Sequence, residues 1–106
     1  MAKYLMQVSY TADGAKGLVK DGGSKRREVA GKLIQSLGGK MEAFYFAFGE
    51  TDAVVLADLP DNGAAAAAGI ALAASGAVTN KVMVLLTAEE VDQAVKKTAT
   101  YTPPGR

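Results

Sequence analysis

The segment from Lys40 to Leu59 constrains the fold of this chain more than any other stretch. It contains two apolar runs, rich in aromatic or β-branched residues, on either side of the polar stretch Gly49-Glu50-Thr51-Asp52. Two such runs with a short glycine-containing connection are typical of a β-hairpin. We therefore expect this hairpin to form the middle of a β-sheet and the floor of any pocket.

Two further strands flank the hairpin in the sequence. Residues 3–10 alternate, so that Tyr4, Met6 and Val8 fall on one face, and this period of two predicts the first strand. Residues 78–86 are rich in Val, Met and Leu and predict the fourth.

Helices are predicted between these strands. Residues 15–20 favour a short helical turn, and after Gly22-Gly23 we expect Ser24 to cap a longer helix. The stretch 64–76 is nearly all Ala and Gly and predicts the second main helix, because Ala has the highest helix propensity. Its small side chains would let that helix lie close to the sheet.

The last part of the chain is predicted to be a short helix and an extended tail. Thr87 and Glu90 have the spacing of a capping box. Residues 98–106 are expected to be extended. The whole order, β-α-β-β-α-β followed by a short helix and tail, indicates one α+β domain over residues 1–106. Its expected fold is ferredoxin-like, with a four-stranded antiparallel sheet.

The strands are apolar on both faces, which predicts an assembly. In the third strand Val54 and Leu56 oppose Ala53, Val55, Ala57 and Leu59. In the second strand the alternation sets one group of side chains against another: Met41, Ala43, Tyr45 and Ala47 against Phe44, Phe46 and Phe48. Helices can cover only one face, and monomers rarely expose apolar patches above a few hundred Å². We therefore expect a homodimer packed sheet to sheet, with a higher oligomer as an open possibility.

Composition narrows the chemistry. The chain has no His and no Cys, so it lacks the commonest general base and the thiolate metal ligands. Its acidic residues do not cluster at a metal-binding spacing, and we expect no metal and no cofactor. A net charge of +1 gives no indication of nucleic acid. The sequence has neither a membrane-spanning apolar run nor a signal-peptide pattern, so no membrane partner and a cytoplasmic location are expected.

A series of short motifs runs through nearly the whole chain in a characteristic order. They are Tyr10-Thr11 with Gly14, Gly22-Gly23-Ser24 with Arg26-Arg27-Glu28, Leu37-Gly38-Gly39, Phe44-Tyr45-Phe46 with Phe48-Gly49 and Asp52, Pro60-Asp61, Leu85-Leu86-Thr87 with Glu90 and Asp92, and the tail from Tyr101 to Gly105. In these motifs the chain resembles the GYD-domain family. The resemblance implies a ferredoxin-like protomer in a dimeric α+β barrel. Related barrel families include cofactor-independent monooxygenases, muconolactone isomerases and small-ligand-binding proteins.

One departure from the family pattern limits what can be transferred. The family often has an aromatic residue between the Gly and the Asp of its motif, whereas Thr51 stands there in this chain. A role for an aromatic hydroxyl at that point is therefore not carried over.

Six residues are candidates for a ligand site. Arg26 and Arg27 follow Lys25 near the start of a predicted helix, where side-chain cations and free backbone N–H groups can bind an anion. The alternative is a solvated face in which Arg pairs with Glu28 or Asp21. Asp52 begins the third strand and could act as a general base if buried, or could accept backbone hydrogen bonds in a turn.

The other three candidates are tyrosines. Tyr10, Tyr45 and Tyr101 could offer hydroxyl groups to a ligand, or could be amphipathic core and interface residues. Two functional hypotheses follow. The first is a homo-oligomeric module that binds a small, partly apolar or anionic ligand or serves an assembly role. The second is a cofactor-independent, monooxygenase- or isomerase-like enzyme acting on a small aromatic or carbonyl compound.

Overall fold

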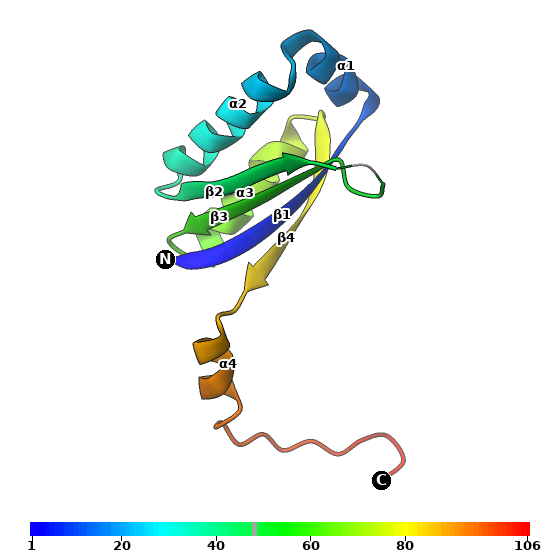
Figure 1. The fold of residues 1–106 in the computed structure, drawn as a ribbon. Helices are drawn as coiled ribbons and strands as arrows, with labels where there is room; N and C mark the ends of the chain where they lie inside the picture. The colour runs from blue at the N-terminus through cyan, green and yellow to red at the C-terminus, as the bar shows by residue number, and fades with distance from the viewer. Residues whose placement is uncertain (48) are drawn as a thin grey trace.

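The computed structural model describes residues 1–47 and 49–106, and its sheet confirms the expected α+β fold. The chain forms a four-stranded antiparallel sheet with strand order β2-β3-β1-β4 (Figure 1). The elements are β1 (Ala2–Tyr10), α1 (Ala12–Asp21), α2 (Gly23–Ser36), β2 (Lys40–Phe46), β3 (Ala53–Leu59), α3 (Asn62–Ala74), β4 (Val78–Leu85) and α4 (Ala88–Ala94). This order is broadly ferredoxin-like, with two helices in the first crossover.

The hairpin is not the middle of the sheet, so that expectation is wrong. Strand β1 pairs with both β3 and β4, which places β1 and β3 in the centre. Strand β2 pairs only with β3 and forms one edge of the sheet. The reason is that β1 pairs non-locally: β3 lies on one side of it, and β4, which follows α3, lies on the other, so β2 is left at the edge.

The first helix starts earlier than predicted. The Thr11 hydroxyl accepts a hydrogen bond from the Gly14 N–H at 3.2 Å, so α1 begins at Ala12 instead of residue 15. Gly14 is required there because a Cβ would lie 1.9 Å from the carbonyl oxygen of Ala77. The helix start is therefore pressed directly against the chain that leads into β4.

The second helix is not capped by Ser24, which corrects a second expectation. It begins at Gly23, and its N-cap residue is Gly22, which makes no side-chain cap hydrogen bond. Gly22 has φ +81°, a left-handed conformation that glycine adopts without strain, and it turns the chain sharply from α1 into α2.

The Ala-rich segment forms α3, as predicted. Asp61 caps it by accepting a hydrogen bond from the Ala64 N–H at 2.8 Å. Ala65 and Ala68 are buried, and Gly69 lies so close to β4 that a Cβ would be 3.0 Å from the Asn80 side chain. The small residues therefore allow close packing of this helix on the sheet, as expected.

The core lies between the sheet and helices α2 and α3. Its fully buried large side chains are Tyr4, Met6, Ile34 and Leu59. A register shift between Met41 and Ala43 leaves Glu42 out of the regular ladder. Met41 consequently lies on the helix-covered face with Phe44, and not with Ala43 and Tyr45 as predicted. The prediction for Phe48 lies outside the described residues.

The opposite side of the sheet, here called the open face, is covered by none of these helices. Its centre carries Leu5, Val54, Leu56 and Met83, none of which is fully buried. Polar residues lie toward its two ends. At one end Lys3 forms ion pairs with Glu42 and Asp58. The apolar centre agrees with the two-sided pattern of the sequence.

Residues 86–106, here called the arm, project from the body. Helix α4 follows β4 and leads into an extended tail that ends far from the sheet (Figure 1). Thr87 and Glu90 form the predicted capping box. The radius of gyration is 16.8 Å, compared with about 13 Å for a compact domain of this length. None of the helices in the described ranges is long and apolar enough to cross a membrane.

Candidate ligand-binding site

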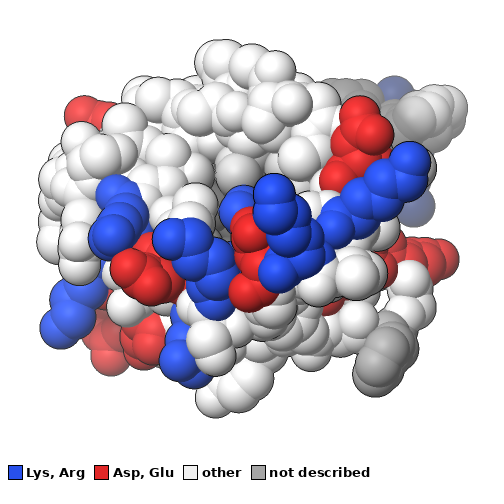
Figure 2. Space-filling model, turned by 90° about the horizontal axis from the view of Figure 1, so that it is seen from above, with Lys and Arg blue, Asp and Glu red and all other residues white. Residues whose placement is uncertain are grey.

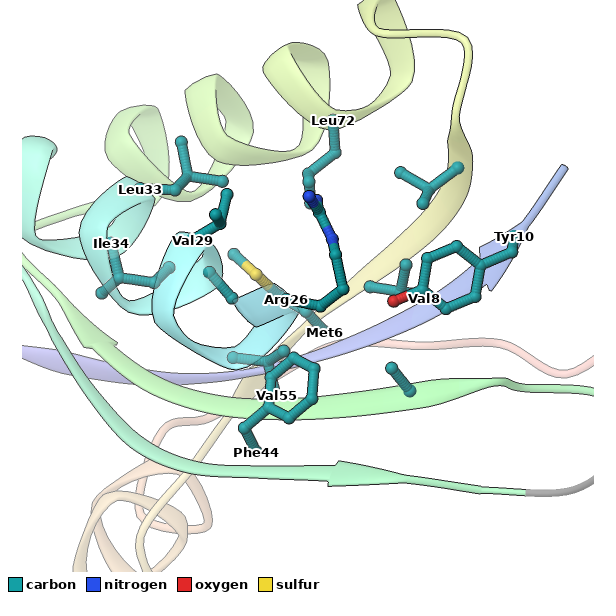
Figure 3. Close-up of a pocket in the computed structure, with 13 residues that line it drawn as sticks. Met6, Val8, Tyr10, Arg26, Val29, Leu33, Ile34, Phe44, Val55 and Leu72 are labelled. Atoms are coloured by element: carbon teal, nitrogen blue, oxygen red, sulfur yellow. The ribbon is translucent and has the colours of Figure 1, made fainter. Parts of the chain in front are cut away.

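A cavity opens between α2, α3 and the helix-covered face of the sheet. Its volume is about 60 Å³. Its walls are almost entirely apolar and come from α2, α3 and the sheet, as Figure 3 shows. They include Met6, Val8, Val29, Leu33, Ile34, Phe44, Val55, Leu72 and Val78. The cavity has room for a short apolar group.

Among the described residues that line the cavity, Arg26 is the one with a charged side chain. The side chain runs from α2 toward Leu72 of α3 (Figure 3). Gly23 makes this placement possible, because a Cβ there would lie 2.9 Å from the Phe46 ring. The first turn of α2 can thus approach the edge strand, and Arg26 lies one turn further on, over the cavity.

The Arg26 guanidinium is only weakly paired. Its Nη1 lies 3.4 Å from Oδ2 of Asp21, and both side chains are about one-third exposed. A guanidinium has five N–H donors, so this single long contact leaves most of its hydrogen-bonding capacity for another acceptor. An anionic ligand group can bind there without displacing a strong ion pair.

Tyr10 lines the same cavity, with its hydroxyl group directed toward the interior (Figure 3). Its backbone N–H donates a hydrogen bond to Oδ2 of Asp52 at 2.8 Å. Asp52 also lines a neighbouring groove with Tyr10, Leu18 and Phe46. Tyr10 therefore borders both the cavity that Arg26 lines and the groove that Asp52 lines, and the Asp52 carboxylate is engaged by the backbone.

Arg27 does not lie in this cavity. It lines a separate groove with Gly23 and Ser24 of α2 and with residues 44–46 of the edge strand β2. Seen from above, basic and acidic side chains alternate in a band across the end of the molecule where α1 lies (Figure 2). The ion pairs that the structure describes on α1 and α2 are Arg26–Asp21 and Lys32–Glu28, and the alternation indicates a solvated surface of mixed charge rather than a concentrated basic patch.

The other two tyrosine candidates lie elsewhere. Tyr45 is 71% exposed and pairs with Val54 on the open face. Tyr101 is 75% exposed and belongs to the arm. Neither lines the cavity, so the six sequence-predicted residues do not form one site.

Some features of the site were missed from the sequence. Leu33, Phe44 and Leu72 line the cavity, but their spacing is the same as that of ordinary core residues.

The ion cluster on the open face was also missed. There Lys3 donates hydrogen bonds to the carboxylates of Glu42 and Asp58, and these bonds raise the pKa of the Lys3 ammonium above its usual value. These three residues are far apart in sequence and meet through strand pairing.

The cavity can hold an apolar group and present a cation and a hydroxyl to a polar one. Among the described residues, no group of three or more His, Cys, Asp or Glu is arranged to hold a metal ion. The described part of the chain also has no buried side-chain polar atom without a hydrogen-bond partner. Because its lining is apolar and Arg26 supplies a positive charge, the site is complementary to an amphipathic anion.

A four-stranded antiparallel sheet with helices on one face defines this chain as a ferredoxin-like α+β protein. The model of the GYD domain matches residues 4–95. The chain therefore belongs to the GYD domain family, as its motifs suggested. No curated protein and no solved structure matches the chain.

Proposed function

We propose that this protein binds a small molecule with an apolar group and an anionic group, and that it does so as a homodimer. The observation that carries the ligand proposal is the position of Arg26 over an apolar cavity. Binding pockets for small molecules are mostly apolar, with a few polar groups that orient the ligand. Here the apolar group would enter the cavity and the anion would accept hydrogen bonds from Arg26.

The arrangement favours binding over proton transfer. An enzyme of the kind considered from the sequence needs a group that accepts a proton from its substrate. The Asp52 carboxylate lies beside Tyr10, and it already accepts a hydrogen bond from the Tyr10 backbone N–H. That bond supports the turn-residue interpretation of Asp52, so we place no reaction at this site.

The open face supports the homodimer. Leu5, Leu56 and Met83 present apolar side chains that none of the helices in the described residues covers. An identical face on a second copy would bury them with matching shape and chemistry, as two-fold symmetric interfaces do.

A cytoplasmic location stays a prediction of the sequence alone.

Thermal unfolding with three probes tests the ligand proposal. Hexanoate carries an apolar chain and an anion, hexanol carries only the chain, and acetate carries mainly the anion. We expect hexanoate at 100 times its dissociation constant to stabilise the protein by about 2.7 kcal/mol. Hexanol and acetate at the same concentration should have a much smaller effect.

Two Arg variants locate the effect. Arg26→Ala should lose at least half of the hexanoate-induced rise in melting temperature. Arg27→Ala removes an equal charge from the same helix but away from the cavity, and it should retain the full shift. Equal shifts in both variants, or no shift with any probe, would overturn the proposed site.

A further inference from the structure

We infer that the arm docks on a second copy of this chain, so that two copies exchange arms. The inference rests on the proposed homodimer and adds the segment that completes its interface. It starts from the apolar side chains of the arm. Val91 and Val95 are four residues apart and share one side of α4, and their exposed fractions are 45% and 76%. Leu86 and Tyr101 are also exposed.

Helix α4 is too short to be stable by itself. It has seven residues, whereas isolated helices shorter than about 12–15 residues are marginal in water. Most helical stability in proteins comes from packing of an apolar side, and the described residues of the same chain bury no residue of α4. A partner surface for the Val91 and Val95 side is therefore needed.

The connection to β4 directs α4 away from its own sheet. Only Leu86 and Thr87 separate the two elements. The Thr87 N–H donates to Oε1 of Glu90 at 3.1 Å, and the Glu90 N–H donates to the Thr87 hydroxyl at 3.0 Å. These reciprocal hydrogen bonds define how the helix starts immediately after the strand. A short hinge of this kind favours exchange of the element with a second copy over folding back.

The small area of the open face also supports an exchange of arms between two copies of the chain. The sheet has four strands, and β2 and β3 have seven residues each. With strands about 4.8 Å apart and residues about 3.4 Å apart, seven residues in each of four strands give the face a projected area of about 450 Å². A stable interface buries about 800 Å² on each partner. The area buried by sheet pairing alone would therefore be too small for a stable dimer. Arms exchanged by two-fold symmetry would enlarge the interface on both copies.

Sedimentation of matched full-length variants tests the arm. Val91→Asp with Val95→Asp puts two charges on the apolar side of α4. Gln93→Asp with Thr98→Asp adds the same charge at other exposed positions of the arm. We expect the dimer dissociation constant to rise at least tenfold in the valine variant and less than threefold in the control. Both variants should keep the far-ultraviolet circular dichroism of the folded body.

A third variant separates this inference from the proposed homodimer. Leu56→Glu places a charge in the centre of the open face and should abolish the dimer while both valines are intact. If the valine variant dimerises like its control while Leu56→Glu dissociates, sheet pairing stands and arm exchange is overturned. A wild-type chain that is monomeric at all concentrations would overturn both.

Discussion

The carboxylate of Asp52 accepts a hydrogen bond from the backbone N–H of Tyr10 at 2.8 Å. The Asp52 N–H in turn donates to the carbonyl oxygen of Val8 at 2.9 Å. These two bonds fasten the end of β1 to the start of β3 beside the cavity. Asp52 thus helps to position the Tyr10 side chain that lines the cavity.

Replacing Asp52 with Ala should therefore destabilise the fold. A hydrogen bond to a charged group contributes about 1.5–3 kcal/mol, and we expect the free energy of unfolding to fall by about that amount. Asp52→Asn keeps an acceptor oxygen and should lose less. Urea unfolding of the two variants measures the difference. An Ala variant as stable as wild type would show that the bond to Tyr10 contributes nothing.

Two glycines of α1 provide a matched pair. Gly14→Ala places a methyl group against the backbone of Ala77, at 1.9 Å from its oxygen, and the helix or the strand must move. We expect a loss of several degrees in melting temperature. Gly17 has open space around its position, so Gly17→Ala should stabilise the protein by about 0.5–1 kcal/mol through helix propensity. Thermal unfolding gives both values, and equal effects of the two substitutions would contradict the close contact at Gly14.

Filling the cavity should prevent ligand binding. Ala30 lines it from α2, and Ala30→Leu adds three carbon atoms to the space. We expect the hexanoate-induced rise in melting temperature to vanish, and the unliganded protein to gain about 1 kcal/mol. Ala66→Leu adds the same group at an exposed position of α3 and should leave the ligand effect unchanged. Full binding by Ala30→Leu would place the ligand elsewhere.

The ion cluster at Lys3 predicts a pH dependence. Hydrogen bonds to Glu42 and Asp58 raise the pKa of Lys3 in the folded chain. A raised lysine pKa gives stabilisation that is complete below the unfolded pKa of about 10.4 and is lost as pH rises through the folded pKa. The stability difference between wild type and Lys3→Met should therefore shrink above about pH 10. Urea unfolding between pH 8 and pH 12 measures it.

A surface lysine without an ion pair serves as the control for this pH dependence. Lys16 makes none with any residue that the structure describes. The difference between wild type and Lys16→Met should stay nearly constant over the same pH range. A constant difference for Lys3→Met as well would show that its ion pairs do not stabilise the fold.

Helices and strands could be predicted largely because their signals are local. The Thr87–Glu90 capping box and the Ala-rich helix α3 each depend on a few neighbouring residues. The place of β2 at the sheet edge depends on distant pairing, and the local hairpin pattern gave no indication of it. The irregularity at Glu42, which moves Met41 to the helix-covered face, has no clear sequence signal either.

The candidate site could be predicted only in part. The chemistry of Tyr10 and Arg26 predicts a role in ligand binding, and the structure brings both residues to one cavity. The hydroxyl groups of Tyr45 and Tyr101 predict the same role, but the fold separates both side chains from the cavity. The apolar walls were not predictable as a site, because Leu33 and Leu72 follow the same helical spacing as core residues. Convergence of side chains from different elements is a property of the tertiary structure.

The most direct test of ligand binding is a titration of the protein with hexanoate, followed by nuclear magnetic resonance. Binding in the cavity predicts progressive shifts of the methyl signals of Val29, Leu33 and Leu72 and of the Arg26 Nε–H signal. These shifts should saturate together with one dissociation constant. Shifts confined to Leu56 and Met83 of the open face, or the absence of any saturable shift, would contradict a ligand site between α2, α3 and the sheet.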